Sequence, residues 1–364
     1  MSGVIVHEWL ESVGGGERVA DALADEFPDA PIVCPWDDVA GRYGPGRVTQ
    51  SWLAGTPLRR HKAAAMPLLL PWWRSLPAFD ADWMLVATHL FAHHARLRGA
   101  ARDVPKYVYT YSPGRSIWEP DIDERGQGLM ARTAAGPLRV LDRKRAAEPL
   151  KVAAVSHFIA ERIERCWDRE SAVINPPVDV AAFPGSDDEL TDQELRQVES
   201  LPEGFVFGAS RFVPYKRVDV AITAGVAADL PVVIAGDGPE RARLAALADE
   251  HPGRVTFLHR PSDAVMRALY RRASVYVFAA IEDFGIMPVE AMAAGTPVVG
   301  NAIGGASETV VDGETGALFR STDAAELRRA VELALTMDPA ACRARAAQFD
   351  GARFGENIRD WMAL

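Results

Sequence analysis

One pair of cations in the second half of the chain has the types and spacing suited to a diphosphate. Arg211 and Lys216 lie on the loop after a predicted strand at 205–209, at its carboxyl end, where open α/β sheets bind their ligands. Arginine holds phosphate oxygens through paired hydrogen bonds, and lysine acts as a point charge. An isolated pair of this kind is more often a solvated surface feature. Together with the acidic turn described next, the pair predicts a clamp on a pyrophosphate leaving group.

The segment from Glu282 to Glu290 (EDFGIMPVE) follows a predicted strand and opens a short helix. Pro288 suits the first turn of that helix, and Gly295 suits its end. The turn at 285–287 therefore presents backbone N–H groups without helical partners, which attract an anion together with the helix dipole. Glu282 and Glu290 would lie on either side of the anion and accept hydrogen bonds from sugar hydroxyls. The alternative is a solvated loop charge and a helix N-terminal charge.

Two glycine clusters lie next to predicted strands. Residues 14–16 (GGG) follow the first strand and precede a helix that we expect from about Glu17. Glycines there let the backbone approach a ligand, although by themselves they are also a flexible turn. Residues 236–239 (GDGP) follow the second strand of their domain and lack the third glycine of a dinucleotide fingerprint. We interpret them as a tight turn before a helix, which makes a two-domain NAD enzyme a weaker alternative.

The elements that must position these residues alternate between short β-rich runs and helical runs, a pattern typical of an α/β protein with parallel sheets. The acidic stretch 181–202 interrupts this alternation, which then restarts. We therefore predict two doubly wound, Rossmann-like domains at 1–180 and 181–345. Residues 346–364 are expected to form a helix that packs back on the first domain. The predicted strands are 3–6, 83–87, 107–110, 152–155, 205–209, 231–235, 255–258, 275–279 and 297–300.

Composition sets the class of protein. A chain of 364 residues that is 48% hydrophobic and 25% charged is long enough for two cores. A formal net charge of −10 argues against a nucleic-acid partner, because phosphate backbones need a broad basic face. Three widely spaced cysteines form no metal-binding pattern and suit a reducing compartment. The first residues lack the regions of a signal peptide, so we expect a cytoplasmic protein.

Residues 66–73 (MPLLLPWW) form the longest apolar run, which is far short of the roughly 18 residues of a membrane span. Its two prolines and adjacent tryptophans make a regular helix or a central strand an unfavourable interpretation. A packed loop is one alternative. The other is an interfacial patch that, with the basic residues 59–62 (RRHK), makes peripheral contact with the inner face of an anionic membrane.

These motifs, taken in order, resemble the retaining GT-B glycosyltransferases of family 4, and within them the bacterial mannosyltransferase-like branch that builds surface polysaccharides. The likeness covers nearly the whole chain, and several motifs in family order are more specific than any one of them. The segments that carry it are 6–10 (VHEWL), 14–18 (GGGER), 111–118 (YSPGRSIW), 154–160 (AVSHFIA), 174–179 (INPPVD), 210–217 (SRFVPYKR), 235–239 (AGDGP) and 282–290 (EDFGIMPVE).

The resemblance implies two domains that face an interdomain cleft and a retaining, metal-independent hexosyltransferase. A nucleotide-diphosphate sugar, with GDP-mannose as the best guess, would be its co-substrate rather than a cofactor. The acceptor would be a glycan or a polyprenyl-linked species. Departure of the phosphate on the same face as acceptor attack would need no carboxylate nucleophile. The implied roles are Arg211 and Lys216 on the diphosphate, Glu282 on sugar hydroxyls, Glu290 on the ribose, backbone amides at Phe284, Gly285 and Ile286 on the donor, and Gly15 and Gly16 on the diphosphate from the first domain.

Two positions depart from the family pattern: Tyr111, and Ser116, where the family has tyrosine after Arg115. Related sequences commonly carry His-Thr-Pro where this chain has Tyr111-Ser112-Pro113, so histidine chemistry cannot operate at that position. Tyr111 is expected to donate a hydrogen bond to the sugar or the leaving group. The change motivates one alternative, a GT-B protein that binds a sugar nucleotide without turnover. A nucleotide-sugar epimerase is a separate alternative in the same fold, and the spacing of the family motifs argues against it.

Overall fold

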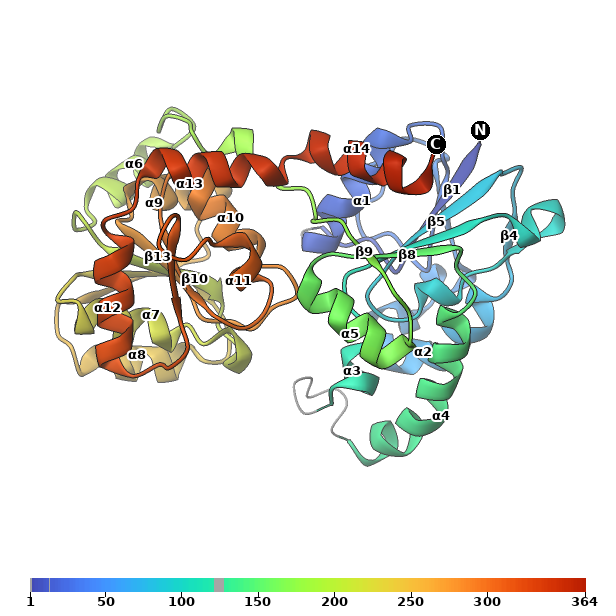
Figure 1. The fold of residues 1–364 in the computed structure, drawn as a ribbon, viewed down its shortest axis with the longest axis horizontal. Coiled ribbons are helices and arrows are strands. Elements are labelled where there is room, and N and C mark those ends of the chain that lie inside the picture. Colours follow the sequence, from blue (N-terminus) through green and yellow to red (C-terminus); the bar gives the residue numbers. More distant parts are fainter. Residues whose placement is uncertain (1, 13, 121–127) are drawn as a thin grey trace. The chain divides into compact units, whose positions relative to one another are not determined.

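The computed structural model describes residues 2–12, 14–120 and 128–364. The chain forms two compact units (Figure 1). Unit 1 contains residues 1–177 together with 351–364, and unit 2 contains residues 178–350. Each unit is built around its own parallel sheet with helices packed on it. The predicted α/β fold with two Rossmann-like units is confirmed.

The main sheet of unit 1 has seven parallel strands in the order β3-β2-β1-β5-β7-β8-β9. Its central strands are buried along their whole length, as parallel strands covered on both faces must be. The short strands β2, β3 and β9 escaped prediction, because two or three residues carry too little pattern. The strands are β1 (Gly3–His7), β2 (Ile32–Cys34), β3 (Val48–Gln50), β5 (Trp83–Thr88), β7 (Lys106–Thr110), β8 (Lys151–Ala154) and β9 (Ala172–Val173), and a separate pair is β4 (Leu76–Ala78) with β6 (Leu97–Arg98).

The helices of unit 1 include one from the end of the chain. Helix α14 packs on α1, and Arg359 of α14 forms an ion pair with Glu26 of α1. The hydroxyl of Tyr107 donates to the carbonyl of Met362 at 3.1 Å. The helices are α1 (Gly15–Glu26), α2 (Lys62–Trp73), α3 (Arg115–Trp118), α4 (Leu129–Ala146), α5 (His157–Trp167) and α14 (Gly351–Met362), with 3₁₀ turns η1 (Trp52–Gly55), η2 (Pro57–Arg60), η3 (Ala92–His94) and η4 (Gly99–Asp103).

Unit 2 contains a six-stranded parallel sheet in the order β12-β11-β10-β13-β14-β15. The strands are β10 (Val206–Arg211), β11 (Val232–Asp237), β12 (Val255–His259), β13 (Val275–Phe278), β14 (Val298–Asn301) and β15 (Gly316–Phe319). The helical elements are η6 (Val180–Ala182), α6 (Asp192–Glu199), η7 (Pro214–Lys216), α7 (Asp219–Ala227), α8 (Arg241–Asp249), α9 (Asp263–Arg272), α10 (Ile286–Ala293), α11 (Ala306–Thr309), α12 (Ala324–Ala334), α13 (Pro339–Ala346) and η8 (Ala347–Phe349).

The apolar run at 66–73 is a helix, which corrects the expectation of irregular structure. It forms most of α2, with Pro67 and Pro71 inside the helix. Each proline removes one backbone hydrogen bond, at a typical cost of about 3 kcal/mol. Ala65, Leu69 and Trp73 recur at every fourth residue and are buried in the core of unit 1. Burial of this stripe offsets the proline cost, because tertiary packing overrides local propensity.

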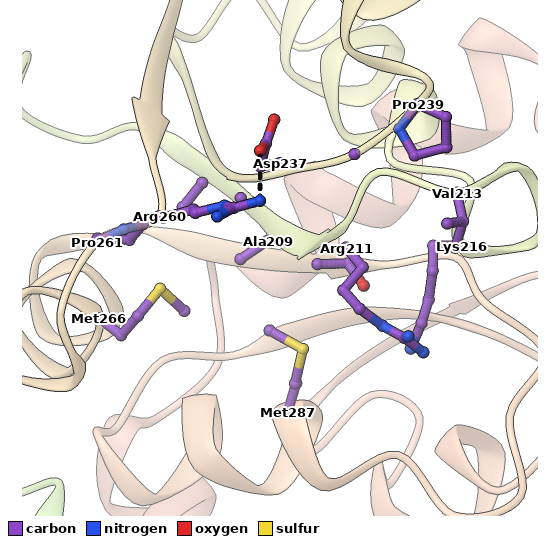
Figure 2. A pocket seen from close by; sticks show the side chains of 14 residues that line it. Ala209, Arg211, Val213, Lys216, Asp237, Pro239, Arg260, Pro261, Met266 and Met287 are labelled. Carbon is purple, nitrogen blue, oxygen red and sulfur yellow. Dashed lines mark ion pairs between the residues drawn. The ribbon is translucent and has the colours of Figure 1, made fainter. Parts of the chain in front are cut away.

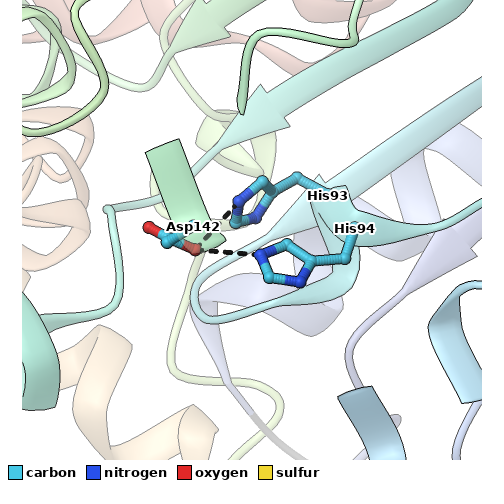
Figure 3. Close-up of side chains that lie close together, drawn as sticks. All are labelled: His93, His94 and Asp142. Carbon is cyan, nitrogen blue, oxygen red and sulfur yellow. Dashed lines mark hydrogen bonds and ion pairs between the residues drawn. The ribbon is translucent and has the colours of Figure 1, made fainter. Parts of the chain in front are cut away.

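Asp142 on α4 connects four elements of unit 1. Its side chain is fully buried, and Oδ2 accepts hydrogen bonds from the indole N–H groups of Trp118 and Trp167, each at 2.7 Å. Figure 3 shows the rings of His93 and His94 directed at the same carboxylate, with their Nε2 atoms 3.0 and 3.1 Å from Oδ1. The carboxylate thus joins α3, α4, α5 and η3.

We predict that Asp142→Ala lowers the free energy of unfolding of the full chain by about 3–5 kcal/mol, because it leaves several buried donors without an acceptor. Urea unfolding followed by tryptophan fluorescence measures the change. Asp25→Ala, at an exposed position on α1, is the matched control and should change stability by less than about 0.5 kcal/mol. Equal stability of the two variants would contradict the role of Asp142.

Candidate functional site

A cavity of about 620 Å³ opens where β10 and β11 of unit 2 end (Figure 2). Arg211 is the last residue of β10 and is paired in register with Asp237, the last residue of β11. Adjacent parallel strands therefore present opposite charges at the edge of the sheet. The cavity is lined by Ala209, Ser210, Arg211, Val213, Lys216, Ala235, Gly236, Asp237, Gly238, Pro239, Arg260, Pro261, Met266 and Met287.

The two predicted cations lie at this cavity. The exposed side chain of Arg211 donates from Nη2 to the hydroxyl of Tyr215 at 3.2 Å. Lys216 ends the short turn η7, and its side chain is only 11% exposed. Its ammonium group forms an ion pair with Glu282. The structure thus brings three of the predicted catalytic residues, Arg211, Lys216 and Glu282, into one region of unit 2.

The acidic turn has the predicted local form. Gly285 adopts φ 88°, which favours glycine, and α10 begins at the next residue. Phe284 is 4% exposed, its ring packs against Phe349 and its backbone packs against Gly305. Among the residues that line the cavity, α10 contributes Met287. Glu290 is 7% exposed and accepts a hydrogen bond from Tyr270 at 3.3 Å.

The sequence did not predict Arg260 as part of this region, and it predicted residues 236–239 only as a tight turn. Arg260 forms an ion pair with Asp237, with 3.0 Å between Nη2 and Oδ2. Burial opposes ionisation of Asp237, but the N–H of Gly238 and the neighbouring cations hold the pKa of its carboxyl below the ordinary value. A Cβ at Gly236 would lie 1.9 Å from the carbonyl oxygen of Ser210. The glycine there is required by the close approach of two backbones.

Unit 1 contributes a second cluster, at the carboxyl ends of β1 and β7. Gly15 and Gly16 lie in the first turn of α1, which begins two residues before the predicted start. The hydroxyl of Tyr111 lies 3.1 Å from both the carbonyl oxygen of Gly16 and Nε2 of His7. Nδ1 of His7 lies 2.9 Å from the carbonyl oxygen of Trp9. Because a carbonyl can only accept, Nδ1 carries the proton, and Nε2 is left as an acceptor facing Tyr111.

Glu8 holds the loop after β5 beside this cluster. Its carboxylate is 1% exposed and accepts five hydrogen bonds, from the hydroxyl of Thr88 and the backbone N–H groups of His89, Leu90, Phe91 and Ala92. Burial opposes ionisation, but nearby His89 and these donors lower the pKa of Glu8. His89 lies 6.2 Å from Tyr111 between ring centroids. Histidines from β1 and the loop after β5 therefore flank the tyrosine.

Neither His7 nor Glu8 was predicted as a site residue, although the two residues come directly after the first predicted strand at 3–6. That position, at the carboxyl end of a parallel strand, was the available signal. Burial is the main cause that lowers the pKa of His7 to about 4, and neighbouring His89 lowers it further. His7 is thus a neutral hydrogen-bonding group at pH 7, and burial raises the pKa of Tyr111 well above its ordinary value. His7 therefore contacts the hydroxyl of Tyr111 as a neutral ring and adds no positive charge to this cluster.

His93, His94 and Asp142 form the group of described side chains whose ligand atoms lie close enough to hold a metal ion. Both carboxylate oxygens of Asp142 already face N–H donors, and all three side chains are buried. Burial also lowers the pKa of His94 to about 4, so its ring is neutral and can donate to Asp142. A hydrogen bond to Asp142 accounts for His94, and His93 is placed by the 3.0 Å contact of its Nε2 with Oδ1 of the same carboxylate.

Comparisons with known proteins bear on the same region. Residues 192–349 match the family model of the glycosyl transferases group 1. D-inositol 3-phosphate glycosyltransferase of Mycolicibacterium smegmatis is 39% identical over 197 residues, which are 50% of this chain and 43% of the relative. The corresponding enzyme of Mycobacterium tuberculosis is 36% identical over 174 residues, 44% of this chain and 35% of the relative. The chain thus spans less than half the length of these curated relatives.

Solved structures resemble the whole chain in fold. Anabaena Alr3699/HepE, solved in complex with UDP and glucose, has a TM-score of 0.71 at 19% identity and covers 100% of this chain and 99% of its own. Sucrose-phosphate synthase from Thermosynechococcus elongatus has a TM-score of 0.71 at 18% identity, covering 100% and 98%. These structures establish the GT-B type of fold. The match to the group 1 glycosyltransferases covers residues 192–349. Among the described residues, no helix is long and apolar enough to cross a membrane.

Acidification from pH 7 to 5 should destabilise the protein through His7 and His94. Each has a folded pKa of about 4 against an ordinary 6.5. Between these values the unfolded chain binds protons that the folded chain does not, so stability falls as the pH is lowered through this window. The expected loss at pH 5 is about 2 kcal/mol for each histidine. Urea unfolding at the two pH values measures it, and His7→Gln should reduce the loss by about 2 kcal/mol. An equal loss in the variant would contradict a neutral His7.

Proposed function

We propose that this protein is a retaining, metal-independent glycosyltransferase that binds a nucleotide-diphosphate sugar at the cavity of unit 2. The observation that carries the proposal is the position of Arg211 and Lys216 at one cavity on the carboxyl edge of the sheet. The match of residues 192–349 to group 1 glycosyltransferases supports it.

Each residue has a role in this proposal. Arg211 and Lys216 bind the diphosphate and stabilise the charge that develops on it as the glycosidic bond breaks. Glu282 holds Lys216 in place before the donor binds, and then accepts hydrogen bonds from hydroxyls of the sugar. The first turn of α10 directs backbone N–H groups and the positive end of its dipole toward the anion. These groups supply the positive charge that a metal ion supplies elsewhere.

The remaining donor contacts follow the same plan. Glu290 binds the ribose, which requires its buried carboxylate to exchange or share its hydrogen bond with Tyr270. Gly15 and Gly16 approach the diphosphate through their backbone. Tyr111 donates to the sugar or to the leaving phosphate, which requires its single hydroxyl proton to leave the Gly16 carbonyl oxygen and Nε2 of His7. A carboxylate nucleophile is not needed if the leaving phosphate oxygen accepts the proton of the acceptor hydroxyl.

The sugar is proposed to be a hexose, with GDP-mannose as the first donor to test. HepE is a structural neighbour that was solved with UDP-glucose, so UDP-glucose is the second. The acceptor is proposed to be a glycan or a polyprenyl-linked species. Binding of the nucleotide sugar without transfer is the competing function, favoured by tyrosine at position 111 where related sequences commonly carry histidine.

Nucleotide binding tests the site directly. We predict that one of GDP, UDP, ADP and TDP binds the full chain in EDTA, as measured by calorimetry, and that Lys216→Ala weakens this binding by about 10²-fold, because a charged partner of the diphosphate is lost. Lys144→Ala, at an exposed lysine on α4, is the matched control and should bind as the parent does.

Three results separate the functions. Transfer of sugar from the nucleotide that binds, measured with radiolabelled donor and a lipid extract, supports the enzyme. Metal-free binding without turnover of the donor favours the competing function. Failure of all four nucleotides to bind, or equal binding by the parent and Lys216→Ala, would contradict the proposed diphosphate site.

A peripheral membrane contact through residues 59–73 is part of the proposal for the acceptor. Leu68 of α2 is 39% exposed and follows the basic residues 59–62, whereas Trp73 is buried in the core. Replacement of Trp73 would therefore disturb folding rather than test the surface. The proposed site of action is the cytoplasmic face of an anionic membrane.

We predict that Leu68→Ser lowers the fraction of protein that floats with anionic vesicles by about three- to tenfold, because it removes apolar area from the contact. Leu335→Ser in unit 2, where the leucine is 45% exposed, is the matched control. Equal flotation of both variants and the parent would exclude a contact through α2.

A further inference from the structure

A second cavity, of about 500 Å³, belongs wholly to unit 1 and has an unusual concentration of arginine. It lies beside the small sheet formed by β4 and β6, where α2 and α4 end. Unlike the cavity of unit 2, it includes none of the predicted donor residues. Its lining residues are Arg74, Ser75, Arg96, Leu97, Arg98, Gly99, Arg102 and Arg145.

One glutamate holds the inner part of this arginine pocket. Glu148 forms ion pairs with Arg74 at 2.7 Å, Arg145 at 2.8 Å and Lys106 at 3.2 Å. Burial opposes ionisation of this carboxyl, but hydrogen bonds from Arg145, Arg74 and Lys106 lower its pKa to about 2. Burial lowers the pKa of Lys106 to about 8. One negative charge is therefore shared among three cations.

The outer part of the pocket has less compensation. Arg96 pairs with Asp103, a carboxylate that is 77% exposed. Arg98 donates from Nε to the carbonyl oxygen of Leu76 at 3.2 Å. In the described part of the chain, Arg102 forms no hydrogen bond or ion pair with another side chain. The pocket and its neighbour Lys106 thus present six cations, of which four pair with the carboxylates of Glu148 and Asp103, on a protein with a net charge of −10.

Structural needs explain only some of these arginines. Arg74 caps the end of α2 and Arg145 lies in the last turn of α4. The helix dipole stabilises a positive charge at both of these positions. Arg98 and Arg102 are exposed and belong to no α-helix. They lie on the short 3₁₀ turn η4, with Arg98 at its N-cap and Arg102 in its last turn, so at most the dipole of one short turn favours Arg102. Clustering of their charges beside three further arginines costs free energy through repulsion unless an anion is bound.

We propose that this arginine pocket binds a phosphate-bearing anion. Guanidinium groups match phosphate oxygens through paired hydrogen bonds and remain charged at any physiological pH. The volume admits a group of the size of a diphosphate or a phospholipid headgroup. The same chemistry could come from a soluble phosphorylated ligand or from a lipid, and a lipid is consistent with the position of Arg74 at the end of α2.

The probe for the test is inorganic pyrophosphate, titrated calorimetrically in metal-free buffer. The titration uses the full chain with Lys216→Ala, so that the cavity of unit 2 contributes little. We expect saturable binding that is about tenfold or more weaker when Arg98→Ala and Arg102→Ala are added. The matched control carries Arg328→Ala and Arg353→Ala, two exposed arginines elsewhere, and should bind as its parent does. Unchanged melting temperatures show that the variants fold, and Arg102→Ala alone replaces the double variant if it does not.

Flotation with phosphatidylglycerol and phosphatidylcholine vesicles then identifies the source of the phosphate. Selective binding to phosphatidylglycerol that pyrophosphate displaces and the double variant loses supports a lipid headgroup. Pyrophosphate binding without vesicle binding supports a soluble ligand. Absence of saturable pyrophosphate binding, or equal binding by the double variant and the control, overturns the proposal. These results do not depend on whether the cavity of unit 2 binds a nucleotide sugar.

Discussion

Parallel strand pairing is the constraint on which the placement of the candidate chemistry depends. Every strand of both large sheets runs in the same direction as its neighbours. The carboxyl ends of each sheet therefore lie along one edge, and loops that are distant in sequence meet there. Arg211 and Asp237 meet in this way in unit 2. His7 and Tyr111 meet in this way in unit 1.

The two units compensate the charges of their candidate site residues in different ways. In unit 1, the buried carboxylate of Glu8 accepts five hydrogen bonds from the end of β5 and the loop after it. These bonds stabilise the loop and leave no free carboxylate oxygen for chemistry. In unit 2, Lys216 and Glu282 neutralise each other while remaining partly accessible. A diphosphate that binds Lys216 would compete with Glu282 and release it for a sugar hydroxyl. The first arrangement is suited to support, and the second to exchange with a ligand.

Two features show why local sequence was a limited guide. Tyr111 stands where related sequences commonly carry histidine, yet His7 from β1 and His89 from the loop after β5 lie beside it. The cluster therefore still contains histidines, although that position in the sequence does not. The prolines of α2 argue against a helix, yet the buried stripe of Ala65, Leu69 and Trp73 stabilises one. In both cases the deciding contacts join residues far apart in the chain, and neither is visible in a window of neighbours.

The sequence by itself determined the α/β class, the two Rossmann-like units, the turn before α10 and the cations Arg211 and Lys216. Alternating strands and helices, glycine at a left-handed position and charges after a strand are all local signals. Only the tertiary structure decided that Lys216 pairs with Glu282, that Glu8 is satisfied by the loop after β5, and that five arginines from separate elements share a pocket. Such contacts depend on strand order and on burial, because charge and distance act between residues that are neighbours in space.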